Sequence, residues 1–189
     1  MAGSLDVIIC THNRAEELKQ TLISVLECKR PDEIEVRILV VANACTDDTV
    51  AIVKDMNLHV VEESRPGLAH ARNRGLAETS GDAILWFDDD VSPDPDIFLA
   101  YVKAFQDYAD AGFFGGPIRP VFAGPSPVWI EQAVRLIPSS WAGLDLGDPT
   151  SYWSRRGSDF LMVPTSCFGG RRYPADSTRN SGAIAQRSF

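Results

Sequence analysis

Residues 82–90, with the sequence DAILWFDDD, join an apolar run directly to three consecutive aspartates. An apolar run of this length predicts a buried strand, so the aspartates are expected at its carboxyl end, where open α/β sheets place their ligands. Adjacent carboxylates repel one another unless a hard cation lies among them, and Mg²⁺ and Mn²⁺ prefer carboxylate oxygens and phosphates. The triplet alone fits a metal-bound diphosphate and, equally well, a solvated acidic turn.

Strand-like and helix-like segments alternate on both sides of this run. Strands are predicted at residues 5–10, 35–41, 58–61 and 83–87, each followed by a helical pattern. This order predicts an α/β fold with a mainly parallel central sheet covered by helices on both faces. Asn13 is predicted to cap the first helix. In the helix over residues 67–78 the side chains expected to face inward are Leu68, Ala71, Gly75 and Leu76.

The second half of the chain is less regular. One amphipathic helix is predicted over residues 128–137, and the segment from residue 164 is rich in Gly, Ser and Arg without a clear period. We therefore expect one domain over residues 1–163 and an irregular or poorly ordered C-terminal tail over residues 164–189.

Composition limits the function. The chain has 189 residues, a net charge of −8 and a pI near 4.8, which argues against binding to nucleic acid or to anionic membranes in general. Its four cysteines lack metal-binding spacing and are expected to be reduced thiols in a cytoplasmic protein. No apolar stretch approaches the roughly 18 residues of a membrane span. A weak peripheral contact with the inner face of the membrane, through residues 128–137, is an alternative.

Four motifs, in this order and spacing, resemble family 2 glycosyltransferases: VIICTHNR (7–14), VVANACTDDT (40–49), GLAHARNRG (67–75) and DDD (88–90). The resemblance implies a GT-A fold, an α/β/α sandwich that binds a nucleotide sugar. It also implies transfer of a sugar from a nucleoside-diphosphate donor to a saccharide, lipid or other acceptor, with inversion at the anomeric carbon. Mg²⁺ or Mn²⁺ would hold the diphosphate.

The resemblance also implies roles for the acids and for the first motif. Asp88 and Asp90 match the family's DxD pair, which places both at the metal and Asp88 near the ribose as well. Asp89 is either a contact to the sugar or a solvated neighbour. Thr11 is expected to contact the base. Asn13 lies at the nucleotide pocket as well as at the predicted helix cap, and Arg14 reaches either a phosphate or solvent.

The two middle motifs add a departure and an arginine. Ala42 stands where the family usually has an acid that contacts the base or ribose, so the nucleotide is not identified and Asn43 is expected to take over part of that contact. Arg72 matches the family's arginine and is expected to bond phosphate oxygens. These expectations place a nucleotide-sugar site at Thr11, Asn13, Arg14, Asn43, Arg72, Asp88 and Asp89, with a metal at Asp88 and Asp90.

The expected general base has no counterpart in this sequence. The family supplies it from an acidic motif well downstream of the DxD pair, and the chain's remaining candidate acids, none in the expected Glu-Asp pair, are Asp145, Asp148, Asp159 and Asp176. The sequence therefore favours a truncated or altered glycosyltransferase. The alternatives are a donor-binding module without activity and, less well supported because no Gly-rich phosphate loop follows the first strand, a nucleotidyltransferase.

Overall fold

The computed structural model of the chain describes residues 3–108, 113–116, 121, 129–130, 132 and 167–171. Strands and helices alternate through them, as the apolar pattern predicts. The strands of this described part are β1 (Ser4–Thr11), β2 (Glu35–Asn43), β3 (His59–Glu63), β4 (Ala83–Phe87), β5 (Phe113–Gly115) and β6 (Cys167–Arg171). Its helices are α1 (Ala15–Glu27), α2 (Thr49–Asp55), α3 (Leu68–Glu78) and α4 (Ile97–Asp107). The predicted α/β class is confirmed.

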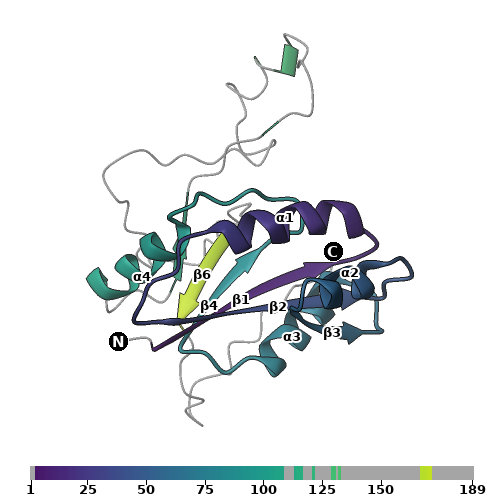
Figure 1. Cartoon of the computed structure of the whole chain (residues 1–189), viewed down its shortest axis with the longest axis horizontal. Helices are drawn as coiled ribbons and strands as arrows, with labels where there is room; N and C mark the ends of the chain where they lie inside the picture. The colour runs from purple at the N-terminus through teal and green to yellow at the C-terminus, as the bar shows by residue number, and fades with distance from the viewer. Residues whose placement is uncertain are drawn as a thin grey trace, which may run out of the picture. The chain divides into compact units, whose positions relative to one another are not determined.

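The strands form one sheet in the order β3-β2-β1-β4-β6-β5 (Figure 1). β1 pairs in parallel with both β2 and β4, and β2 pairs in parallel with β3. The register places Ile9 beside Val40 on one side and beside Phe87 on the other. The strand order therefore reverses between β1 and β4, and open α/β sheets bind ligands beyond the carboxyl ends of the strands at such a point.

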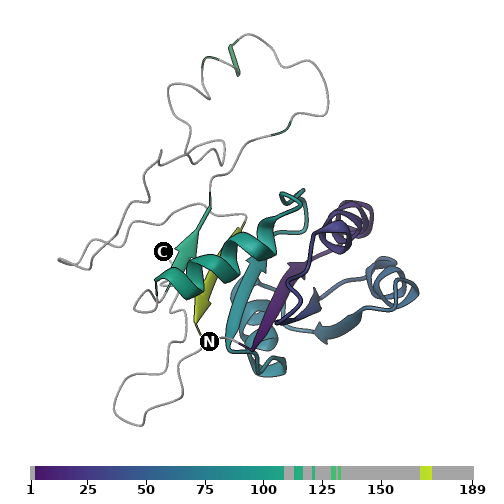
Figure 2. The same cartoon turned by 60° about the vertical axis from the view of Figure 1, so that its left-hand side comes forward.

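Right-handed crossovers decide which face of the sheet each helix covers. α1 and α2 connect strands that step outward from β1 to β3, and the two helices contact each other. α3 returns the chain from β3 to β4 and therefore lies on the opposite face, against β1, β2 and β3 (Figure 2). Gly75 permits this close packing, because a Cβ at that position would lie 2.7 Å from Cγ2 of Ile8.

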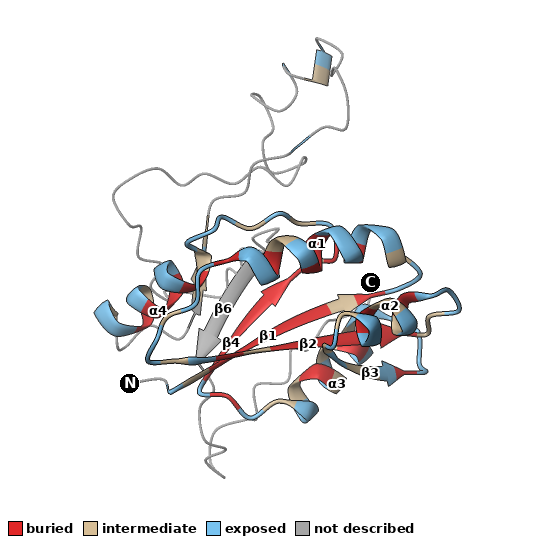
Figure 3. Ribbon diagram, in the orientation of Figure 1, coloured by how far each residue is buried: buried red, intermediate tan, exposed pale blue. Residues whose placement is uncertain are grey.

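The core is built on β1, β2 and β4, whose residues are buried almost without interruption (Figure 3). Continuous burial is typical of parallel strands that are covered on both faces. On α1 the buried stripe contains Leu18, Leu22 and Val25, and α4 places Phe98 against Phe87 with ring centroids 6.5 Å apart. Each fully buried side chain of this size contributes roughly 1.5–3 kcal/mol.

Asn13 does not cap α1, contrary to the prediction. The helix begins at Ala15, Arg14 is the N-cap without a side-chain hydrogen bond, and Asn13 has a φ of 52°. Oδ1 of Asn13 instead accepts a hydrogen bond from the amide of Thr46 at 2.7 Å, while the amide of Ala15 donates to Oδ2 of Asp47 at 3.1 Å. The loop after β2 therefore replaces the local cap, which spacing along the first motif cannot reveal.

The prediction that Leu68 faces inward is also wrong. It was expected to face inward with Ala71 and Gly75, but it is 47% exposed, whereas the other two are buried. Leu68 is the first residue of α3, about two turns before the helix makes its close contact with the sheet at Gly75.

The tail prediction missed β6, which lies inside residues 164–189. Gly169 and Gly170 lie within this strand. Because glycine has a weak strand propensity, the sequence of this segment did not indicate a strand. The rest of that tail, most of the helix predicted over residues 128–137, and Asp145, Asp148, Asp159 and Asp176 lie outside the described residues.

The chain divides into a compact unit of Met1–Phe114 with Gly169–Phe189 and a second unit of Gly115–Phe168. The predicted boundary at residue 163 stays a prediction. Among the helices that the structure describes, none has the length and apolar character that crossing a bilayer requires.

Candidate functional site

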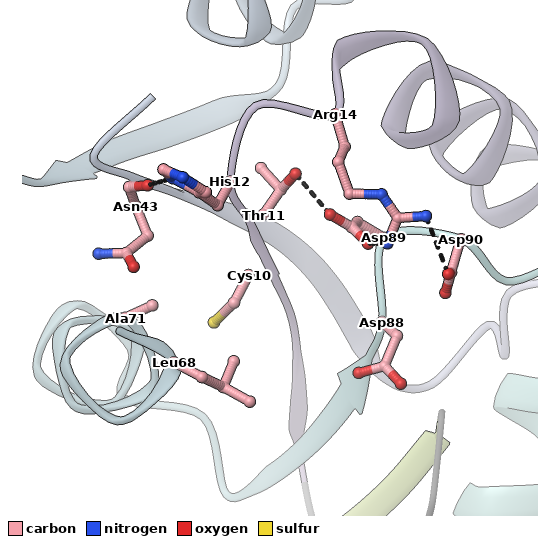
Figure 4. Close-up of a pocket in the computed structure, with 10 residues that line it drawn as sticks. All are labelled: Cys10, Thr11, His12, Arg14, Asn43, Leu68, Ala71, Asp88, Asp89 and Asp90. Carbon is pink, nitrogen blue, oxygen red and sulfur yellow. Dashed lines mark hydrogen bonds and ion pairs between the residues drawn. The ribbon is translucent and has the colours of Figure 1, made fainter. Parts of the chain in front are cut away.

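The acidic triplet begins where β4 ends. Asp88, Asp89 and Asp90 follow Phe87 at the carboxyl end of the sheet, beside the end of β1. Figure 4 shows their carboxylates below Thr11, the last residue of β1, and Arg14, which precedes α1. The predicted location of the aspartates, at the carboxyl end of a buried strand, is confirmed.

Asp89 is the buried member of the triplet, with 7% of its surface exposed. Its Oδ2 accepts a hydrogen bond from Oγ1 of Thr11 at 2.6 Å, and its Oδ1 accepts one from Nη1 of Arg14 at 2.9 Å. Burial raises the pKa of this carboxyl, although the Thr11 hydrogen bond and the charge of Arg14 act in the opposite direction. Asp89 therefore attaches the triplet to β1, and its burial excludes the solvated role considered above.

Thr21 on α1 holds the backbone of the same turn. Its Oγ1 donates to the carbonyl oxygen of Asp89 at 2.9 Å and accepts from the amide of Val91 at 3.1 Å. Thr21 is 2% exposed, and its hydrogen bond to Asp89 is buried whereas the one from Val91 is partly buried. The position of the triplet is thus set by the end of β1, the loop that follows it and α1, which are consecutive in the chain but 68–78 residues away from the aspartate that they hold.

Asp88 and Asp90 differ from Asp89 in their surroundings. Asp90 is exposed and pairs with Nη2 of Arg14 at 3.0 Å. Asp88 is half-buried, and none of the described residues donates a hydrogen bond to its carboxylate. Burial raises the pKa of Asp88, the charge of Arg72 lowers it, and the other two aspartates raise it.

This set of oxygen donors fits Mg²⁺ or Mn²⁺. A desolvated carboxylate without a hydrogen-bond donor, next to two more carboxylates, gains from a hard cation. Within the described ranges no three His, Cys, Asp or Glu side chains are arranged to enclose an ion by themselves. Mg²⁺ does not require such a cluster, because it is usually bound by one or two carboxylates together with waters and substrate phosphates.

A pocket of about 310 Å³ lies over these groups (Figure 4). It is lined by Cys10, Thr11, His12, Arg14, Asn43, Leu68, Ala71, Asp88, Asp89 and Asp90. Acids and hydroxyl groups form one side, while Cys10, Leu68 and Ala71 form an apolar side. Among the predicted site residues, Thr11, Arg14, Asn43 and the three aspartates meet in this pocket, whereas Asn13 and Arg72 are not part of its lining.

Asn43 lines the pocket at the end of β2, with its amide bonded to the loop after β3. Nδ2 donates to the carbonyl oxygens of Glu63 at 3.2 Å and Arg65 at 2.7 Å, and Oδ1 accepts from the amide of Gly67 at 2.8 Å. The carbonyl oxygen of Asn43 lies 2.6 Å from Nδ1 of His12, so that nitrogen must carry the proton. Asn43 therefore positions both the loop and the imidazole.

Arg72 lies on α3 and is not part of the pocket lining. Its Cζ is 5.8 Å from the ring centroid of Trp86 on β4, and its charge acts on both Asp88 and Cys10. Burial raises the pKa of the Cys10 thiol to about 12, with Arg72 opposing this shift and Asp88 adding to it. Cys10 is thus protonated at neutral pH, which excludes a thiolate nucleophile at this position.

Several residues of the site were missed by the sequence analysis. Cys10, Leu68 and Ala71 form the apolar side of the pocket, and His12 lines it with its ring held by the carbonyl oxygen of Asn43. Thr21 did leave a signal, because it interrupts the apolar face of α1 between Leu18 and Leu22. A buried hydroxyl on such a face must find hydrogen-bond partners, and the turn after β4 provides them.

Residues 6–178 match the model of Glycosyl transferase family 2. Among curated proteins, the chain is 29% identical over 134 residues to the glucosyl-dolichyl phosphate glucuronosyltransferase of Haloferax volcanii, and the match covers 68% of this chain and 42% of that protein.

Solved structures give the same fold. The mannosyltransferase PcManGT of Pyrobaculum calidifontis, in complex with GDP-Man and Mn²⁺, has a TM-score of 0.56 and 29% identity, covering 61% of this chain and 36% of that one. TarS 1–349 of S. aureus, in complex with UDP-GlcNAc, has a TM-score of 0.56 and 25% identity, covering 66% of this chain and 37% of that one. The expected GT-A fold is confirmed. The chain spans less than half the length of each of these three proteins.

Proposed function

The chain belongs to glycosyl transferase family 2, and from this membership we propose that it acts in transferring a sugar from a nucleoside-diphosphate donor to an acceptor, with Mg²⁺ or Mn²⁺ at Asp88 and Asp90. The observation that carries the proposal is the half-buried Asp88 carboxylate, without a donor among the described residues, on the pocket wall beside Asp90. The complexes of the two structural relatives, with GDP-Man and Mn²⁺ and with UDP-GlcNAc, support it.

The side chains around the acids suit a nucleotide diphosphate. Thr11 donates its hydroxyl proton to Asp89 and keeps lone pairs that can accept a hydrogen bond from the base. Asn43 and Asn13 act indirectly, by fixing the loops after β3 and β2. Arg14 from the pocket wall, and Arg72, whose charge acts on Asp88, supply positive charge for phosphate oxygens.

The reaction that fits is a single displacement. The acceptor's hydroxyl oxygen bonds to the anomeric carbon as the bond from that carbon to the diphosphate oxygen breaks, so the configuration inverts. The electron pair of the broken bond stays on the diphosphate, and a divalent cation at Asp88 and Asp90 would neutralise the charge that develops there. The hydroxyl proton passes to a general base. None of the described pocket residues is assigned this role, because their acids hold the metal or the strand end.

A second candidate is a donor-binding module without transfer of its own. It is favoured by the described pocket, whose acids are assigned to the metal or to the strand end and none to the general base. The two candidates share the donor site and differ in turnover. The cytoplasmic location, with or without peripheral contact at the membrane, stays a prediction.

Calorimetric titration tests the donor site. UDP, GDP, TDP and CDP are titrated with and without Mn²⁺ into the wild type, Asp90→Asn and the control Asp107→Asn. Asp107 is an exposed acid on α4 that pairs with Lys103. One nucleotide should bind in a metal-dependent way to the wild type and the control, and at least tenfold more weakly to Asp90→Asn. Equal binding by all three proteins would contradict the assignment of the metal.

Turnover separates the two candidates. The chain is incubated with the nucleotide sugar whose base the titration identifies, Mn²⁺ and a panel of saccharide and lipid-linked acceptors, and release of nucleoside diphosphate is followed by chromatography. Acceptor-dependent release identifies a transferase. Metal-dependent binding without release, for every acceptor, identifies a donor-binding module.

A further inference from the structure

Arg14 bridges two aspartates of the triplet. Nη1 lies 2.9 Å from Oδ1 of Asp89, and Nη2 lies 3.0 Å from Oδ2 of Asp90 (Figure 4). The Asp89 side chain is 9% exposed, whereas that of Asp90 is 50% exposed. One guanidinium therefore holds a buried carboxylate with one nitrogen and an exposed carboxylate with the other.

These two contacts differ in strength. The carboxylate of Asp89 is also held by Thr11, and its backbone is held by Thr21, so Asp89 is a fixed anchor. Within the described part of the chain, Asp90 pairs with Arg14 alone, and ion pairs this exposed contribute little. Arg14 is thus firmly attached at Asp89 and weakly attached at Asp90.

A divalent cation at Asp90 competes with Arg14 for the same carboxylate. The two positive groups repel each other. Mg²⁺ also approaches a carboxylate oxygen to about 2.0–2.1 Å, which is closer than the nitrogen of a hydrogen-bonded guanidinium can come. Loss of the Asp90 contact leaves Nη2 in the pocket, because Nη1 stays on Asp89 and Arg14 is part of the lining. A guanidinium nitrogen released there suits a phosphate oxygen.

We propose that Arg14 is an internal counter-ion of the triplet: it occupies Asp90 while no cation is bound, and exchanges Asp90 for the diphosphate of the donor when metal and donor bind. This inference rests on the proposed donor site. The exchange makes metal and nucleotide binding cooperative, since the nucleotide accepts the guanidinium that the metal displaces, and this coupling is reciprocal. Arg14 then acts as a positioning residue in the empty site and as a phosphate ligand in the loaded one.

Metal titration of variants gives the first test. Mn²⁺ without nucleotide should bind Arg14→Gln about fivefold more tightly than the wild type, the effect of removing a half-exposed ion pair. Arg14→Lys keeps the charge but cannot bridge two carboxylates, so it should bind Mn²⁺ with intermediate affinity. The control is Arg30→Gln, whose guanidinium is 3.4 Å from the carbonyl oxygen of Val36 near the start of β2. It should behave as the wild type.

The order of the Mn²⁺ affinities of wild type and Arg14→Gln should reverse when the nucleotide is present. With the nucleoside diphosphate that binds the wild type added at saturation, Arg14→Gln should bind Mn²⁺ more weakly than the wild type, because the released phosphate contact is missing. An Arg14→Lys variant equal to the wild type in both titrations would reduce the effect to net charge and overturn the exchange. So would an Arg14→Gln variant that binds Mn²⁺ no more tightly than Arg30→Gln.

Nuclear magnetic resonance of the arginine side chains gives a direct readout that does not depend on activity. The Nε–H signal of Arg14 is identified by its loss in Arg14→Gln and followed as Mg²⁺ is added to the wild type. It should shift with Mg²⁺ alone and again with nucleoside diphosphate, while the Arg30 signal stays in place. An unchanged Arg14 signal at saturating metal would overturn the exchange alone. A wild type that binds no metal with or without nucleotide would overturn the proposed function and the exchange together.

Discussion

Replacing Thr21 with valine should loosen the acidic triplet without changing any residue that lines the pocket. Valine has nearly the shape of threonine, so the packing of α1 against the sheet is retained while the hydroxyl is lost. That hydroxyl donates to the carbonyl oxygen of Asp89 at 2.9 Å and accepts from the amide of Val91 at 3.1 Å. Thr21→Val therefore leaves one backbone acceptor and one backbone donor without their partner.

The magnitude follows from the burial of these groups. A buried polar group left without a partner costs about 1–3 kcal/mol. Thr21 and Asp89 are buried, whereas Val91 is half-buried, so water can reach the amide more easily than the carbonyl oxygen. The loss in unfolding free energy should be roughly 2 kcal/mol, and metal-dependent nucleotide affinity should fall about tenfold, as a loss of about 1.4 kcal/mol implies.

Denaturant unfolding and calorimetric titration measure the two effects. The matched control is Ser24→Ala on the same helix, because the hydroxyl of Ser24 donates only to the carbonyl oxygen of Gln20, one turn earlier, at 3.1 Å. This variant should stay within about 0.5 kcal/mol of the wild type and keep its nucleotide affinity. Equal unfolding free energies for Thr21→Val and Ser24→Ala would refute the reasoning that α1 holds the triplet through this hydroxyl.

Three further predictions concern other parts of the structure. Hydrogen bonds from the Arg65 side chain and amide lower the pKa of Glu63 from 4.5 to about 2, so the stability that Glu63 contributes is present above pH 4.5 and lost as the pH falls toward 2. The difference in unfolding free energy between wild type and Glu63→Gln should therefore close over that range, as acid titration of unfolding will measure. Arg72→Lys removes the planar group that lies over Trp86, and calorimetry should show nucleotide affinity about tenfold lower with the fold intact. Gly81→Ala should cost roughly 2 kcal/mol, because its Cβ would lie 2.6 Å from Oδ2 of Asp6, whereas Gly3→Ala, with 3.6 Å to Asp82, should unfold at the wild-type denaturant concentration.

The sequence predicted the sheet well because the sheet depends on local patterns. The run from Ala83 to Phe87 was predicted with the bounds that the structure shows, and the strands around it differ by one or two residues at their ends. Parallel strands buried on both faces require continuous apolar runs, and such runs are visible without knowing their partners. The location of the triplet followed from the same argument, since only the end of its strand had to be known.

Contacts between segments that are distant in the sequence could not be predicted from the local pattern. The spacing of the first motif predicted Asn13 as a helix cap, but the acceptor for the first amide of α1 is Asp47, 32 residues away from Ala15. The hydrogen bond between Thr11 and Asp89 spans 78 residues. Neither pairing leaves a trace in local periodicity, because each is decided by which strands become neighbours in the sheet.

In the triplet, one buried acid positions a half-buried and an exposed one. All three line the pocket, but burial is high at Asp89 and lower at Asp88 and Asp90, so the middle carboxylate is the one most enclosed by protein. The two carboxylate oxygens of Asp89 accept hydrogen bonds from Thr11 and Arg14, and its backbone carbonyl accepts one from Thr21. Those contacts leave Asp88 without a hydrogen-bond donor in the described structure and Asp90 with one weak ion pair. The spacing of the two proposed metal ligands around one intervening residue therefore has a physical reason, because the intervening acid fixes the turn on which the other two carboxylates lie.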